Sequence, residues 1–124
     1  MAFFVPCRFR FFYHPAHNYR LFIAESSIHA GSPYMVGGRP VWKPFGKGGE
    51  KAVLPATVLD FAKRLGLACR DQLPSAFVVD VGLIDGRGWA VVEFNPVWCS
   101  GILSADPDKI LDVLILAAIQ DANK

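Results

Sequence analysis

The chain has 124 residues, of which 52% are hydrophobic and 19% charged, a composition that excludes a disordered protein and is typical of one domain with its own core. The net charge of +2 is too small to indicate nucleic acid as a partner. The three cysteines are widely spaced, no apolar run reaches the roughly 20 residues of a membrane span, and the N-terminus has no secretory signal pattern. We therefore expect a soluble, cytoplasmic protein without membrane association.

The first half of the chain predicts one hairpin between two irregular segments. Residues 3–13 are β-prone but contain a proline, which favours an edge strand or an irregular start. Residues 19–24 predict a strand, residues 25–27 a turn and residues 28–35 the returning strand. Residues 37–51 are so rich in Gly and Pro that we expect a loop without regular structure.

The second half predicts a helix followed by a second hairpin. Apolar residues recur at helical spacing over residues 55–65, and Gly66 is placed to end this helix. Residues 76–84 and 89–95 predict the two strands of the hairpin, because both are rich in β-branched and aromatic residues and a Gly-containing turn separates them.

The closing helix is expected over residues 107–122. Asp106 is a good N-cap, and Pro107 suits the first helical position. The middle of this helix is apolar nearly all round, which predicts that it is largely buried. Together the elements predict an α+β domain, in which two hairpins form an antiparallel sheet and both helices pack on one face.

The second hairpin brings two carboxylates opposite each other. Gly86-Arg87 is the favoured two-residue loop, because a type II′ turn takes Gly at its first central position. This register pairs Asp80 with Glu93, and Asn95 shares their face of the sheet. A one-residue slip of the turn would separate the two carboxylates, which would then simply reach solvent.

Like charges directly opposed on a sheet are destabilising unless something neutralises them. A raised pKa, a neighbouring Lys or Arg, or a bound cation would each do so. Two carboxylates and an amide oxygen are hard donors that suit Mg²⁺ or Mn²⁺ held jointly with phosphate oxygens. Asp80, Glu93 and Asn95 are therefore candidate metal ligands. Basic residues predominate in residues 1–51 and acidic ones in residues 52–124, which suits either a phosphate and metal cleft or two solvated faces.

The pattern of Asp80 followed by Glu93-Phe94-Asn95 resembles the metal-binding hairpin of the ATP-grasp superfamily. The runs YRLFIAESSIHAGSPY and SAFVVDVGLIDGRGWAVVEFNPVWCSGI and the closing DPDKILDVL resemble a clade of poorly characterised, mainly bacterial members of that superfamily. The resemblance implies that residues 19–124 are the C-terminal lobe of an ATP-grasp fold, which binds ATP with Mg²⁺ (or Mn²⁺) through Asp80, Glu93 and Asn95.

The resemblance further implies ATP-dependent ligation, in which a carboxylate substrate is phosphorylated and an amine or thiol displaces the acyl phosphate. Arg20 matches a basic residue that lies near the nucleotide phosphates or the acyl phosphate in related ligases, which implies a catalytic and cofactor-binding role. In the Gly-rich loop, Arg39, Lys43 and Lys47 are candidates for contacting phosphates. This loop lacks the Walker spacing, and the alternative is a surface loop without a ligand.

The resemblance does not extend to residues 1–18, and the first lobe of an ATP-grasp fold has no counterpart in this sequence. We therefore expect a partner chain or a homo-oligomer to supply it. The alternative is a truncated, non-catalytic remnant that acts as an interaction or dimerisation module. Residues 7–20 mix arginine with aromatic residues as single-stranded nucleic-acid platforms do, but a strand with a buried aromatic face is the interpretation that we favour.

Overall fold

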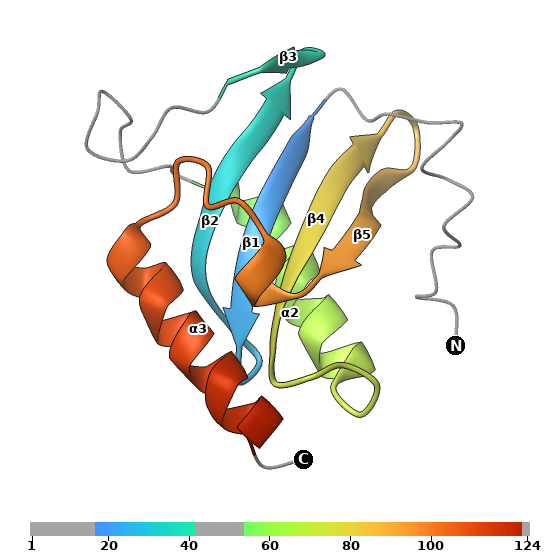
Figure 1. The fold of residues 1–124 in the computed structure, drawn as a ribbon. Coiled ribbons are helices and arrows are strands. Elements are labelled where there is room, and N and C mark those ends of the chain that lie inside the picture. Colours follow the sequence, from blue (N-terminus) through green and yellow to red (C-terminus); the bar gives the residue numbers. More distant parts are fainter. Residues whose placement is uncertain (1–16, 42–53, 123–124) are drawn as a thin grey trace.

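The computed structural model describes residues 17–41 and 54–122, which form a five-stranded antiparallel sheet with a helix on each face (Figure 1). The strands lie in the order β3-β2-β1-β4-β5, so β1 is central and β5 is an edge strand. The elements are β1 (Asn18–Ala24), β2 (Ser27–Val36), β3 (Arg39–Pro40), α2 (Ala56–Cys69), β4 (Ala76–Ile84), β5 (Gly88–Asn95), the short 3₁₀ helix η1 (Val97–Cys99) and α3 (Pro107–Ala122).

Both faces of the sheet are apolar, because side chains alternate along its central strand. Leu21 and Ile23 of β1 pack in the core beneath α2, whereas Phe22 and Ala24 pack in the core beneath α3. The prediction of an α+β domain with an antiparallel sheet is confirmed, but the expectation that both helices share one face is wrong. A sheet with two apolar faces needs a helix on each side to remove both from water.

Helix α2 is longer than predicted, since it continues through Gly66 to Cys69. A glycine inside a helix costs about 1 kcal/mol relative to alanine. Leu65 and Cys69 are both buried in the α2-side core. Packing of the last turn therefore outweighs the low helix propensity of Gly66.

Helix α3 has the predicted bounds and the predicted cap. A carboxylate oxygen of Asp106 accepts a hydrogen bond from the backbone N–H of Asp108 at 3.0 Å, and the Asp106 carbonyl accepts one from the N–H of Ile110 at 3.1 Å. The side-chain bond satisfies an N–H group that has no partner within the helix. The sequence signal for the start of this helix is therefore confirmed.

The expectation that α3 is largely buried is wrong, because the helix lies on the sheet with one side only. Ile110 and Val113 face the sheet and are buried. Leu111, Ile115 and Ile119, which we call the α3 stripe, are 54%, 49% and 54% exposed. In the described ranges, no helix is both long and apolar enough to cross a membrane.

The loop expected over residues 37–51 contains one short strand. Gly37 and Gly38 have φ angles of +60° and +76°, and they turn the chain so that Arg39 of β3 pairs with Val36 of β2. Glycine adopts positive φ without steric cost, which explains this turn. Residues 42–53, with the candidates Lys43 and Lys47, lie outside the described residues.

Candidate functional site

Four side chains form a row across strands β2, β1, β4 and β5. Arg20 pairs with Ser32 on one side and with Asp80 on the other, and Asp80 pairs in turn with Glu93. We call these four residues the polar row. The residues two positions further along β1 and β4 belong to the α3-side core, so the polar row lies on the sheet face that carries α3.

The predicted pairing of Asp80 with Glu93 is confirmed, although the predicted turn that led to it is wrong. Gly88 pairs with Ile84, so the hairpin loop consists of the three residues 85–87 instead of Gly86 and Arg87 alone. The backbone N–H of Arg87 donates to the carbonyl of Ile84 at 2.9 Å and closes this turn. Three-residue loops are a common alternative to two-residue loops in hairpins.

A β-bulge in β5 restores the register that the longer loop would have shifted. Val81 pairs with Val91, whereas Asp80 pairs with Glu93, so Val92 is the extra residue. The bulge also changes which valine enters the α2-side core, because Val91 is buried there and the predicted Val92 is only half-buried.

The Asp80 carboxylate is paired with the Arg20 guanidinium from the neighbouring strand. Arg20 Nε donates to Asp80 Oδ1 at 2.8 Å, and Arg20 Nη2 donates to Asp80 Oδ2 at 2.9 Å. Two parallel bonds of this kind are the strong, geometrically specific form of an ion pair. The Arg20 and Asp80 side chains are only 13% and 11% exposed, so solvent screens the pair little. Of the three ways to neutralise the carboxylates, the structure shows the neighbouring arginine.

Two further groups hold the guanidinium in place. Arg20 Nη1 donates to the Gly101 carbonyl at 3.1 Å, and the guanidinium carbon lies 5.6 Å from the centroid of the Tyr34 ring. The hydrogen bonds with Asp80 raise the pKa of Arg20 above its ordinary value, burial acts in the opposite direction, and the charge of Glu93 adds to the rise. Arg20 is therefore charged, and its field reaches both carboxylates.

Glu93 and Asn95 lie together on β5. The Asn95 amide nitrogen donates to Glu93 Oε1 at 3.0 Å, a bond between alternate residues that share one face of the strand. The structure thus brings the three candidate metal ligands onto one face, with Asp80 in register with Glu93 and Asn95 in contact with it.

The segment from Gly101 to Ser104 is fastened to the polar row at two points. The first is the Arg20 bond to Gly101. The second is a 3.0 Å hydrogen bond from the Ser104 backbone N–H to the hydroxyl of Ser32, a side chain that is fully buried. Between them, Leu103 has a φ of +54°, an unfavourable conformation for a non-glycine residue. The connection between η1 and α3 therefore covers the β2 end of the row.

Arg39 is not brought into the polar row. It is exposed on β3, at the edge of the sheet opposite to β5. The predicted roles of Arg39 and Lys43 in contacting phosphates stay predictions.

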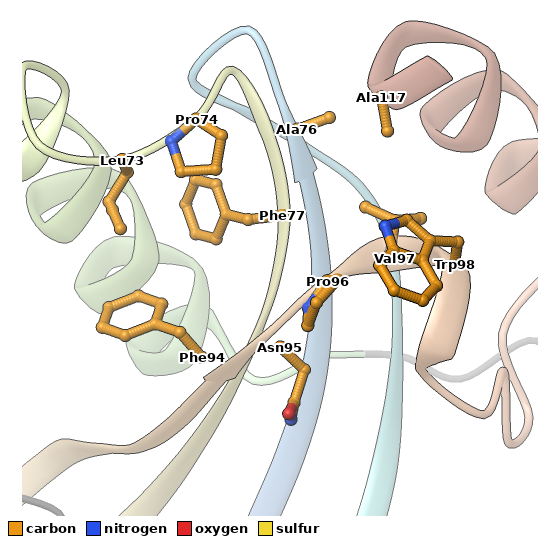
Figure 2. A pocket seen from close by; sticks show the side chains of 10 residues that line it. All are labelled: Leu73, Pro74, Ala76, Phe77, Phe94, Asn95, Pro96, Val97, Trp98 and Ala117. Atoms are coloured by element: carbon orange, nitrogen blue, oxygen red, sulfur yellow. The ribbon is translucent and has the colours of Figure 1, made fainter. Parts of the chain in front are cut away.

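A pocket of about 280 Å³ lies next to this site, at the end of β5. Figure 2 shows Phe77 and Phe94 on one side of it and Val97 and Trp98 on the other, while the Asn95 amide points away from these apolar side chains. Asn95 therefore borders both the pocket and the polar face that carries Glu93.

Sequence reasoning missed Ser32, Tyr34 and Gly101, which surround the Arg20 guanidinium. The alternation of Ser32 and Tyr34 along β2 shows that they share a face, but not which face or which partner. A β-bulge at His29 decides this, because Phe22 pairs with Ala30 while Ile23 pairs with Ile28. No residue pattern in that strand predicts the bulge.

The donor chemistry of Asp80, Glu93 and Asn95 suits a hard divalent cation. In the described ranges, no group of three or more His, Cys, Asp and Glu is placed to hold a metal, so the Asn95 amide is needed as the third donor. Each carboxylate oxygen has two lone pairs, and the bonds from Arg20 leave further acceptor capacity on Asp80. The residues present therefore fit Mg²⁺ or Mn²⁺, and the assignment of these ligands stays a prediction.

Comparison with known families identifies a match to the ATP-grasp domains. The matching family is the second family of one ATP-grasp clade, and its model covers residues 14–113, which is most of the chain. No curated protein and no solved structure matches the chain. The family match confirms the resemblance that the hairpin motif and its flanking sequences indicated.

Proposed function

The chain belongs to this family of ATP-grasp domains, and we propose that it binds ATP together with Mg²⁺ or Mn²⁺ on the face of the polar row. ATP-grasp membership carries nucleotide binding as its general property. The observation that supports this site is the placement of Asp80, Glu93 and Asn95 on one sheet face beside the Arg20 guanidinium.

Asp80, Glu93 and Asn95 would hold the metal ion, which supplies neutralisation of the phosphate charge when bound. The Asn95 amide fixes the orientation of the Glu93 carboxylate through its 3.0 Å bond. Arg20 presents the planar fork of N–H donors that matches phosphate oxygens, and three of these N–H groups are engaged by Asp80 and Gly101 in the structure. Arg20 is thus within the same site as the proposed metal ligands.

We propose ATP-dependent ligation as the reaction class, with a complementary lobe supplied by another chain or a second copy. A carboxylate oxygen of the substrate attacks the γ-phosphorus and ADP leaves. An amine or thiol then attacks the acyl carbon, and phosphate leaves. The contribution of this chain is positioning and charge stabilisation by Arg20 and the metal-holding residues, which is the main source of catalysis in phosphoryl transfer.

The test is calorimetric titration of a non-hydrolysable ATP analogue into the purified chain, with and without Mg²⁺. We expect binding that requires Mg²⁺ and is lost in Glu93→Gln. Asp60→Asn is the matched control, because Asp60 is a carboxylate 67% exposed on α2, on the other side of the sheet. Binding that is independent of Mg²⁺, or equally strong in Glu93→Gln, would contradict the proposed site.

The α3 stripe favours a second candidate function, that of a self-association module. Leu111, Ile115 and Ile119 recur every four residues and expose one continuous apolar side of α3. In this case the chain forms a stable oligomer that does not respond to ATP. Sedimentation analysis of the wild type and of Ile115→Glu tests this, and a wild type that stays monomeric at high concentration rejects it.

A further inference from the structure

Two residues that are expected to contact the ligand contact each other in this structure. Arg20 occupies both oxygens of Asp80, at 2.8 and 2.9 Å, and the side chains of the pair are mostly buried. Arg20 also lies close enough to Glu93 for its charge to be felt. One guanidinium therefore serves as the cation for two carboxylates, in the place where a metal ion is proposed to bind.

A divalent cation at Asp80 and a guanidinium at Asp80 repel each other. At separations of a few Å, two like charges in a partly buried site cost several kcal/mol at an effective dielectric constant of about 20. The site accommodates both cations only if the guanidinium receives a new anion. Phosphate oxygens are suitable, because the planar fork that matches a carboxylate also matches a phosphate.

Building on the proposed function, we propose that Arg20 is an internal counter-cation that competes with the metal ion for Asp80 and transfers to the phosphates when metal and nucleotide bind together. The contacts around Arg20 support a short movement. Gly101 and Tyr34 contact the guanidinium in addition to the carboxylate, so it remains in the site after it leaves Asp80.

The exchange makes the binding of metal and nucleotide cooperative. Metal alone must displace Arg20 without giving it another anion, so it binds weakly. Metal with nucleotide supplies that anion, so the two bind more tightly together than either does alone. By linkage, each ligand then increases the affinity for the other by the same factor, which is typically about 5- to 150-fold.

The test measures Mn²⁺ affinity by electron paramagnetic resonance of free Mn²⁺, with and without a non-hydrolysable ATP analogue. We expect Arg20→Gln to bind Mn²⁺ alone about tenfold more tightly than the wild type and Mn²⁺ with nucleotide about tenfold more weakly, in line with typical coupling factors. Arg64→Gln is the matched control, because it removes one arginine from an exposed ion pair with Asp60 on α2. It should change neither affinity.

The outcomes separate this proposal from the proposed function. If the wild type does not bind Mn²⁺ with nucleotide, the proposed function is rejected. If it does, and Arg20→Gln weakens both affinities or leaves the affinity for Mn²⁺ alone unchanged, only the exchange is rejected and Arg20 is a fixed structural partner of Asp80.

A measurement on the wild type covers the case in which Arg20→Gln does not fold. The ¹⁵Nε–H resonance of Arg20, assigned with Arg20→Lys, reports on the bond to Asp80. We expect little change with Mg²⁺ alone and a clear shift with Mg²⁺ and nucleotide together. A resonance that is unchanged by both together overturns the proposal.

Discussion

Asp80 is tolerated among the valines of β4 because its charge is matched by a residue from the adjacent strand. Val79 and Val81 face the α2-side core, while Asp80 faces Arg20 across the β1–β4 pair. A buried ion pair is costly to break, since removal of one partner leaves the other charge uncompensated. The polar row is therefore part of the fold as well as a candidate ligand site.

This ion pair predicts a strongly non-additive double-mutant cycle. We expect Asp80→Leu to lower the free energy of unfolding by about 3 kcal/mol, because Arg20 is left mostly buried without its partner. Arg20→Met in the same chain should recover most of that loss, since two apolar side chains then replace two charges. Urea denaturation of the two single variants and the double variant measures the coupling.

The exposed pair Asp60–Arg64 is the control for this cycle. Its side chains are 67% exposed, so Asp60→Leu should change stability by less than about 0.5 kcal/mol. A double variant at Arg20 and Asp80 that is no more stable than Asp80→Leu alone would show that the pair is not the reason for the loss.

At the scale of elements, the β1–β2 turn carries backbone strain. Glu25 and Ser26 have φ angles of +50° and +66°, and Ala24 pairs with Ser27, so they form a two-residue loop of the kind that glycine and asparagine usually occupy. A non-glycine residue in this conformation costs on the order of 1 kcal/mol. The Glu25 N–H donates to the Ser75 carbonyl at 2.7 Å, which helps to hold the turn in place.

This strain predicts that Ser26→Gly stabilises the protein by about 0.5 to 1 kcal/mol, because glycine adopts positive φ freely. Ser27→Gly is the matched control, since Ser27 is the next residue but belongs to β2. There glycine should be destabilising, because it adds backbone entropy to the unfolded chain without relieving strain. Chemical denaturation of both variants is sufficient, and equal effects of the two substitutions would exclude strain at Ser26.

The cap of α3 gives a second prediction about an element. Asp106→Ala should lower stability by about 1 kcal/mol, because the Asp108 N–H loses its acceptor, whereas Asp106→Ser should retain most of it. Thermal unfolding followed by circular dichroism measures both. If Ala and Ser are equally destabilising, the side-chain bond does not stabilise the helix.

The positions of the elements could be predicted from the sequence better than the way in which they join. Helix α3 and the strands of both hairpins follow from local patterns, such as Asp106-Pro107 at the start of the helix. The bulges at His29 and Val92 have no such pattern, although they decide which residues enter the polar row. The agreement on Asp80 and Glu93 came from a loop predicted one residue too short and a bulge that compensates for it.

The partner of Asp80 could not be predicted, because it depends on the order of strands in the sheet. Arg20 and Asp80 are 60 residues apart, and they meet only because β4 lies beside β1. The opposite placement of the two helices is of the same kind. It follows from the burial of both faces of β1, which the sequence shows only as a continuous apolar run.

For the whole molecule, the sheet is shielded from solvent by α2 on one face and by α3 on part of the other (Figure 1). The polar row crosses four of the five strands on the face that carries α3. A ligand that binds Asp80 and Glu93 therefore connects β4 with β5 and, through Arg20, affects β1 as well. We expect such a ligand to stabilise the whole fold.

This link between the site and the sheet predicts a rise in melting temperature that needs both ligands. At free ligand about ten times its dissociation constant, binding to the folded state adds about 1.4 kcal/mol, which is a rise of roughly 3 to 6 °C for a domain of this size. Mg²⁺ alone or nucleotide alone at the same concentration should give a much smaller rise, since Arg20 remains on Asp80 in both cases. The rise should persist in Asp60→Asn and disappear in Glu93→Gln, and an equal rise with nucleotide alone would place the nucleotide elsewhere on the molecule.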